Sequence, residues 1–293
     1  MTESQAGDAA RQGRRAAGGP SPTARPRAAS PSRPARAVDE PRTGTQAIDR
    51  AMAVLRLFAT GRSDLGLLEI ATGAQLSPST AHRIVRALCR AGLVEQDERT
   101  ERYQLGRASI ILFQAAMQRF GFTAALPDLE DLARETAESA SVGVADGTDI
   151  VVVLQTASTH PLRFDRQPGT RVPFHVSAMG KALLAFSDLD PKVAAKRLDV
   201  LPRFTAATIT RRSDLVAELQ RIRERGWALN DGERYEGVRA VAVPLLDDAG
   251  RARAAVGLQG PADRLDDARV TAVLPALREH ADRIARRVHL DLL

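Results

Sequence analysis

The sequence predicts an α+β chain with two folded parts, and three observations carry the prediction. Apolar residues recur at helical spacing in three segments between residues 48 and 92, and two short β-prone stretches follow them. Beyond residue 121, β-prone stretches joined by tight turns alternate with amphipathic segments, which favours an antiparallel sheet with helices packed on it. The length of 293 residues is enough for two domains of ordinary size.

Residues 1–44 differ from the rest of the chain in composition. They hold eight Arg against four acidic residues, and Met1 and Val38 are their only larger apolar side chains. Such a stretch buries too little apolar surface to offset chain entropy, so we predict a disordered Arg/Pro/Ala-rich tail. It lacks the amphipathic pattern of a transit peptide, and no apolar run follows Arg14-Arg15 as an export signal requires. A solvated tail is the favoured interpretation, and weak extra contact with nucleic acid is the alternative.

The net charge of +6 lies in the N-terminal part of the chain. Residues 1–44 carry a net +4, residues 45–120 a net +3 and residues 121–293 a net −1. This distribution favours a nucleic-acid partner for the N-terminal part and a small ligand for the C-terminal part. The lone Cys89 excludes a disulfide framework and a Cys-rich zinc site. No apolar run reaches the roughly 18 residues of a membrane span, so we expect a cytoplasmic protein with no membrane partner.

Three helices are predicted in the first folded part. The first carries an apolar stripe of Ile48, Met52, Leu55 and Phe58 and stops at Gly61. The second covers Leu67–Gly73. The third opens at Ser77-Pro78, an N-cap followed by Pro at the first helical position, and runs to about Ala91.

The third helix has two faces. Its apolar side holds Ala81, Ile84, Val85 and Leu88. Its polar side carries a hydroxyl group, a histidine and three arginines, namely Ser79, His82, Arg83, Arg86 and Arg90. Such groups reach phosphates and base edges in a major groove, although any surface helix also has a solvated charged face.

A hairpin follows the third helix. Leu93–Glu95 and Tyr103–Leu105 form two short predicted strands around a polar turn that carries Arg99 and Arg102. Helices followed by a hairpin give the order of a winged helix-turn-helix, in which the two arginines would enter a minor groove or meet phosphates.

This part resembles the DNA-binding half of the IclR family of transcriptional regulators. The matching segments, in the same order and spacing, are Ile48–Phe58, Leu68–Ala71, Leu76–Arg83, Ala91–Val94 and Tyr103–Gly106. The resemblance implies a DNA-binding domain over residues 45–106. The residues expected to contact DNA are Ser79, Thr80, His82, Arg83, Arg86, Arg99 and Arg102.

Residues 107–120 are predicted to form one more amphipathic helix. We expect its apolar residues to be buried, namely Ile110, Ile111, Phe113, Met117 and Phe120. In the resembling family this segment is the linker helix between the two domains.

Residues 121–293 are expected to alternate helices and strands. Predicted helices cover 126–138, 178–186, 191–198, 213–225 and 265–290, and β-prone stretches cover 141–145, 150–156, 162–164, 172–175, 227–230, 238–245 and 252–259. Tight turns at 146–149 and 247–250 indicate antiparallel pairing.

This part resembles the IclR effector-binding domain, a GAF-like sheet with packed helices. The matching segments are Pro173–Ala182, Thr208–Thr210, Gly226–Glu233, Glu236–Val238, Ala242–Pro244 and Gly260-Pro261. The resemblance implies that an effector contacts Leu162, Phe164, Ala178, Met179, Asn230, Glu233, Val238, Ala240, Gly257 and Gln259. Asn230 stands where the family often has an acid, and Gly257 and Gln259 where it often has hydroxyls, so no relative's ligand is carried over.

No catalytic constellation is visible in the sequence. Gly180-Lys181 lacks the phosphate-loop pattern, and the five histidines lack metal-ligand spacing, so we expect no cofactor, no metal and no enzyme. Asp231 and Glu233 could do acid–base work, but a loop that shapes a pocket explains them as well.

The sequence therefore predicts a ligand-responsive transcriptional regulator, expected to be a repressor. Its expected partners are operator DNA and a small organic effector, with a carboxylate or an aromatic acid as candidates, and the family implies a homodimer or homotetramer. The alternatives are a small-molecule enzyme with an accessory DNA-binding domain and a nonspecific nucleic-acid-binding protein driven by the tail.

Overall fold

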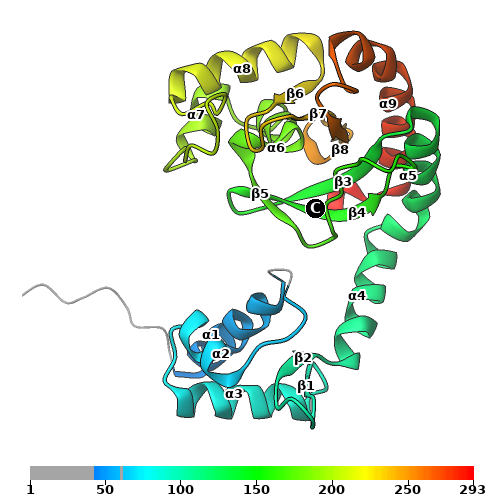
Figure 1. Cartoon of the computed structure of the whole chain (residues 1–293). Coiled ribbons are helices and arrows are strands. Elements are labelled where there is room, and N and C mark those ends of the chain that lie inside the picture. Colours follow the sequence, from blue (N-terminus) through cyan, green and yellow to red (C-terminus); the bar gives the residue numbers. More distant parts are fainter. Residues whose placement is uncertain (1–42, 60–61) are drawn as a thin grey trace, which may run out of the picture. The chain divides into compact units, whose positions relative to one another are not determined.

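The computed structural model describes residues 43–59 and 62–293 (Figure 1). The prediction of a tail over residues 1–44 therefore falls almost entirely outside the described residues, as does the predicted helix stop at Gly61.

The first folded part contains three helices and a two-stranded hairpin. The helices are α1 (Thr43–Phe58), α2 (Leu67–Gly73) and α3 (Pro78–Arg90), and the antiparallel strands are β1 (Val94–Gln96) and β2 (Tyr103–Leu105). The Ser77 side chain accepts a hydrogen bond from the Thr80 backbone N–H at 3.3 Å, which caps α3 as the sequence predicts. Val54, Ile70 and Val85 are fully buried between the helices.

The helix α4 (Arg107–Arg119) begins where predicted and ends one residue earlier, but the prediction that its apolar residues are buried is wrong for its first turns. Ile110 is 58% exposed, Ile111 68% and Phe113 55%, whereas Met117 and Phe120 pack against the core of the second folded part. Four consecutive apolar residues, 110–113, point around the helix in all directions, and no other described element covers them. The result is an exposed apolar surface on α4.

The second folded part is built on a six-stranded antiparallel sheet in the order β5-β4-β3-β8-β7-β6. The strands are β3 (Ser139–Asp146), β4 (Asp149–Thr156), β5 (Arg171–Pro173), β6 (Ala228–Asp231), β7 (Val238–Leu246) and β8 (Ala252–Pro261). The predicted strand over 162–164 is absent, because that segment crosses between β4 and β5 without a ladder partner. The predicted stretch at 172–175 splits into β5 and a 3₁₀ turn over Phe174–Val176.

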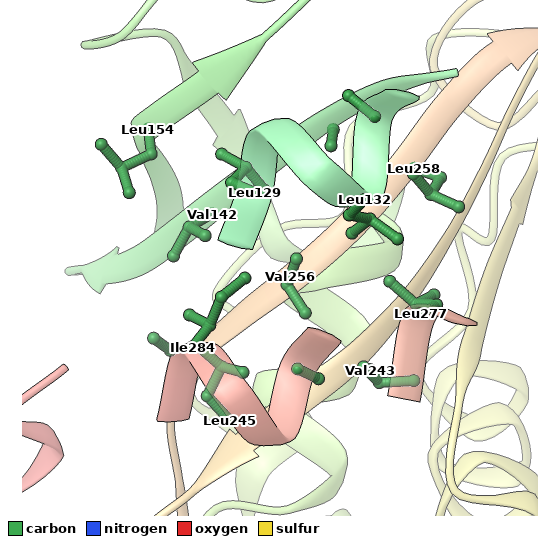
Figure 2. Close-up of a cluster of buried hydrophobic side chains, with 14 of the residues drawn as sticks. Leu129, Leu132, Val142, Leu154, Val243, Leu245, Val256, Leu258, Leu277 and Ile284 are labelled. Atoms are coloured by element: carbon green, nitrogen blue, oxygen red, sulfur yellow. The ribbon is translucent and has the colours of Figure 1, made fainter. Parts of the chain in front are cut away.

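Helices cover both faces of this sheet (Figure 1). The helices α5 (Phe122–Thr136) and α9 (Asp267–Arg287) pack on one face. Figure 2 shows Leu129 and Leu132 of α5 and Leu277 and Ile284 of α9 meeting strand residues such as Val256. The opposite face is covered by α6 (Ala178–Ala185), α7 (Pro191–Lys196) and α8 (Arg212–Arg225).

The two faces of the central strands differ in side-chain size. The face under α5 and α9 carries Val142, Val241, Val243, Val256 and Leu258. The alternate residues face α6 and are small, namely Ser141, Gly143, Ala240, Ala242, Ala255 and Gly257. Small residues leave space between the sheet and the start of α6, and the candidate ligand site lies there.

Candidate functional sites

The polar face of α3 is exposed over its whole length. Ser79, His82, Arg83 and Arg86 are exposed, while Thr80 is half-buried and accepts a hydrogen bond from the Ser77 hydroxyl at 2.8 Å. A groove of about 570 Å³ runs between α1 and α3, and its charged lining is entirely basic, namely Arg50, Arg83, Arg86 and Arg90. None of these four guanidinium groups forms an ion pair with another described residue. Free, clustered arginines on a helix face can bind phosphates and read base edges.

Arg50 is the residue in this groove that sequence reasoning missed. It lies on α1, far from the helix-turn-helix motif in the sequence, and its only sequence signal is one arginine on the polar side of a helix. Packing of α1 against α3 adds it to the basic surface.

The structure separates the two wing arginines that the sequence groups together. Arg99 is exposed at the turn between β1 and β2. The guanidinium of Arg102 instead donates hydrogen bonds to the carboxylates of Asp64 and Glu69, each at 2.6 Å. Glu69 also accepts from the Gly66 backbone N–H at 2.8 Å, at the start of α2. Arg102 thus fastens the wing to α2, which supports a structural role more directly than a DNA contact.

A small pocket lies between the N-terminus of α6 and the small residues of β3, β7 and β8. Its lining brings together five of the ten residues expected to contact an effector, namely Ala178, Met179, Ala240, Gly257 and Gln259. Ser141, Ser177 and Arg166 complete the polar part of the lining. The open volume is about 10 Å³, which is about the space that one water requires.

Arg166 brings a buried positive charge to this pocket. The residue is 8% exposed, and no carboxylate of the described chain pairs with it. Burial, and next the charge of Arg234, lower the pKa of the Arg166 guanidinium to about 10, so it remains a cation at neutral pH. A buried charge without a counter-charge is costly, so an anion placed beside this guanidinium would be stabilised.

Three further donors or dipoles face the same space. The side-chain Nε2 of Gln259 is buried and has no hydrogen-bond partner among the described residues, and Gln259 is 8% exposed. Ser177 caps α6 by accepting from the Gly180 backbone N–H at 3.3 Å. The first N–H groups of a helix carry a partial positive charge and favour anions.

Asn230 and Glu233 do not line this pocket. The Asn230 Nδ2 donates to the Val176 carbonyl at 2.5 Å, and its Oδ1 accepts from the Glu233 backbone N–H at 3.1 Å. The Glu233 carboxylate accepts from the ammonium of Lys181. Burial raises the pKa of Glu233 despite this partner. Both residues therefore hold the loop after β6 against α6.

The other residues expected to contact an effector lie outside the pocket lining. Leu162 is 71% exposed, and Val238 is half-buried at the start of β7. The ring of Phe164 packs against that of Tyr235, with 5.3 Å between centroids. Asp231, which the sequence pairs with Glu233 as a possible acid–base couple, forms an ion pair with Arg239 at 3.0 Å.

Arg166 is the charged residue of the pocket lining that the sequence did not predict, and the uncharged Ser141 and Ser177 were not predicted either. It lies in the irregular segment between β4 and β5, where no periodicity or motif marks one arginine among several. Its role becomes visible only because the fold buries it away from any carboxylate. Within residues 43–59 and 62–293, no cluster of three His, Cys, Asp or Glu side chains could hold a metal ion. In the same part of the chain, no helix is both long and apolar enough to cross a membrane.

Two family profiles match the chain. Residues 47–98 match the IclR helix-turn-helix domain, and residues 116–286 match the bacterial transcriptional regulator IclR C-terminal domain. The chain is 40% identical to the HTH-type transcriptional regulator BhcR of Paracoccus denitrificans over 81% of this chain and 85% of that protein. It is 36% identical to the glycerol operon regulatory protein of Streptomyces griseus over 82% of this chain and 95% of that protein. It is 28% identical to the transcriptional repressor IclR of Escherichia coli over 79% of this chain and 86% of that protein.

Solved structures show the same fold. The IclR protein of Thermotoga maritima has 26% sequence identity and a TM-score of 0.63, and the match covers 83% of this chain and 98% of that chain. An IclR homologue of Microbacterium hydrocarbonoxydans, solved in complex with 4-hydroxybenzoate, has 23% identity and a TM-score of 0.72 over 84% of this chain and 100% of that chain.

Proposed function

Because the chain belongs to the IclR family of transcriptional regulators, which pair a DNA-binding helix-turn-helix with an effector-binding domain, we propose that a small organic acid in the α6 pocket controls its binding to operator DNA. The proposal divides the chain into a DNA-binding domain over residues 45–106, a linker helix over 107–120 and an effector-binding domain over 121–293. Effector binding shifts the balance between arrangements that do and do not fit the operator.

The buried, unpaired Arg166 is the observation that carries the choice of an acid. A carboxylate beside its guanidinium would supply the missing counter-charge in a site of low dielectric constant, where charge-assisted hydrogen bonds are strong. The unpartnered Gln259 amide and the start of α6 would bind the other oxygens of the acid. Ala178, Met179, Ala240 and Gly257 would form the walls around the acid.

The surface of α3 supports DNA binding by a recognition helix. Arg83 and Arg86 would reach base edges or phosphates in the major groove, with Ser79, Thr80 and His82 beside them. Arg50 and Arg90 extend the basic surface and would contact the phosphate backbone. Arg99 would meet DNA from the tip of the wing.

The exposed apolar residues of two helices support a homodimer. Ile48 and Met52 on α1 are 64% and 46% exposed, and α4 exposes Ile110, Ile111 and Phe113. An apolar surface of this kind marks a protein–protein interface, and a two-fold dimer would present two α3 helices to half-sites about one helical turn apart. Relatives named as repressors favour repression as the outcome of operator binding.

The test is a thermal-unfolding titration of the full chain with pyruvate, succinate and benzoate. At least one acid should stabilise the wild type by about 2.7 kcal/mol at a concentration of 100 Kd, and Arg166→Gln should abolish that stabilisation. Arg163→Gln is the matched control, because Arg163 lies in the same segment but is exposed and pairs with Asp165 at 2.7 Å. Equal stabilisation of Arg166→Gln and the wild type would contradict the assignment.

A further inference from the structure

The side chain of Met179 lies across two glycines on neighbouring strands. A methyl group added to Gly143 on β3 would lie 3.3 Å from the Met179 sulfur, and one added to Gly257 on β8 would lie 3.3 Å from its Cγ. The strands β3 and β8 are paired in the sheet, and Ser141 is the register partner of Gly257. A side chain at either glycine would force the Met179 side chain to shift by a few tenths of an ångström.

Met179 is also the large apolar side chain on the α6 side of the pocket, because the side chains of Val241 and Leu258, which border the pocket as well, pack in the cluster under α5 and α9. Ser141, Ala240, Ala242 and Gly257 form the sheet side of the pocket and extend little from the backbone. The two other large side chains, Arg166 and Gln259, are polar and bind an acid in the proposed function. Met179 thus fills the space that remains, and the open volume is about 10 Å³.

Burial holds the thioether in this position. Met179 is 6% exposed and packs within the apolar cluster between α6 and the sheet. Methionine adapts to irregular gaps, but here its sulfur and its Cγ each rest on a glycine, so a longer ligand would have to displace it from both.

We propose that Met179 sets the upper limit on the length of the acid that the effector pocket accepts. This inference rests on the proposed function, because it concerns the acid that Arg166 binds. The carboxylate end of the ligand is fixed by Arg166 and Gln259, and the chain of the ligand extends toward Met179. A short acid fits beside the thioether, and a longer acid clashes with it.

The experiment compares wild type, Met179→Ala and Met179→Leu in binding 2-oxo acids of increasing length, from pyruvate to 2-oxohexanoate. The keto oxygen of these probes can accept a hydrogen bond from the unpartnered Nε2 of Gln259. In the wild type, affinity should fall as the chain lengthens. In Met179→Ala, which frees the space of three heavy atoms, affinity should rise about fourfold for each added methylene group. Met179→Leu keeps most of the side-chain volume and should keep the wild-type order.

The outcomes separate this inference from the proposed function. An unchanged order of affinities in Met179→Ala, with acids still bound, would overturn the role of Met179 and leave the acid site standing. Failure of every acid to bind the wild type or either variant would overturn both the role of Met179 and the acid site. Unfolding curves of each variant without ligand show whether the fold is intact. If Met179→Ala does not fold, Met179→Val, which also shortens the side chain, takes its place and should likewise raise the affinity for the longer acids.

Discussion

The ammonium of Lys181 donates a hydrogen bond to the carboxylate of Glu233, and both side chains are buried, with 1% and 9% exposed. Lys181 lies in α6, whose first residues line the pocket, and Glu233 lies in the loop after β6. The Thr208 hydroxyl donates to the Glu233 carbonyl at 2.7 Å, and the Thr205 hydroxyl donates to the Gly232 carbonyl at 2.7 Å. The Lys181–Glu233 pair therefore fixes the position of α6, the helix on which the proposed acid site depends.

Glu233→Gln should strongly destabilise the protein. The substitution removes the counter-charge of Lys181 and leaves a buried ammonium, a change that typically costs about 3–5 kcal/mol. Urea unfolding of the variant measures the loss. The double variant Lys181→Met/Glu233→Leu, which removes both charges, should recover much of the stability. A free energy of unfolding for Glu233→Gln equal to that of the wild type would contradict the account.

Asp247 should make the stability of the effector-binding domain sensitive to acid. Its carboxylate accepts from the Arg251 backbone N–H at 2.9 Å and from the side chains of Arg251 and Arg253, which lowers its pKa from 3.8 to about 2. A lowered pKa means that the contribution to stability is complete above about pH 4 and is lost as the pH falls from 4 to 2.

Asp247→Asn should flatten this part of the curve of Tm against pH, because an amide does not titrate. Asp248→Asn, in the same turn, is the control, and it should keep the wild-type slope. An unchanged slope in Asp247→Asn would show that other carboxylates carry the acid sensitivity.

Arg83→Ala should weaken operator binding by about 1–3 kcal/mol and relax specificity at one base pair, if Arg83 reads a guanine edge. Arg99→Ala, at the wing, should instead weaken binding to all sequences alike and reduce the salt slope by about 1. Titrations against operator and random duplexes at several salt concentrations distinguish the two. An equal loss on both duplexes for Arg83→Ala would assign it to the phosphates.

Phe113→Glu should convert a dimer into a monomer without unfolding it. A charge placed in an apolar interface must be desolvated, whereas the same charge on an exposed helix face is tolerated by the isolated chain. Analytical ultracentrifugation gives the oligomeric state. Val200→Glu is the control, because Val200 is also apolar and 75% exposed but lies elsewhere on the chain. An unchanged dimer in Phe113→Glu would place the interface on another surface.

The elements of the DNA-binding part were predictable because local signals fix them. Ser77 and Pro78 mark the start of α3, and the predicted bounds of α2 are the observed ones. The six-stranded sheet was predictable as antiparallel because tight turns join β3 to β4 and β7 to β8. Leu162–Phe164 looks like a strand by composition, but strand formation requires a partner, and the sequence alone does not supply that information.

The candidate sites were predictable only in part. Periodicity identified the apolar residues of α4 but not whether anything covers them, because burial depends on tertiary or quaternary contacts. Arg99 and Arg102 look alike in the sequence, and the position of Asp64, 38 residues earlier, decides that Arg102 is held within the domain. Arg166 becomes a candidate only because no carboxylate of residues 43–59 and 62–293 pairs with it in the fold.

An acid held by Arg166 should change the affinity of the protein for operator DNA. The most direct measurement is fluorescence anisotropy of an operator duplex, selected from random sequences by the purified protein, with and without the acid that stabilises the wild type. The acid should weaken operator binding by wild type and Arg163→Gln by about 5- to 150-fold, a typical range for allosteric coupling. Arg166→Gln should bind the operator equally well in the absence of acid and should not respond to it. A full response by Arg166→Gln would contradict the account.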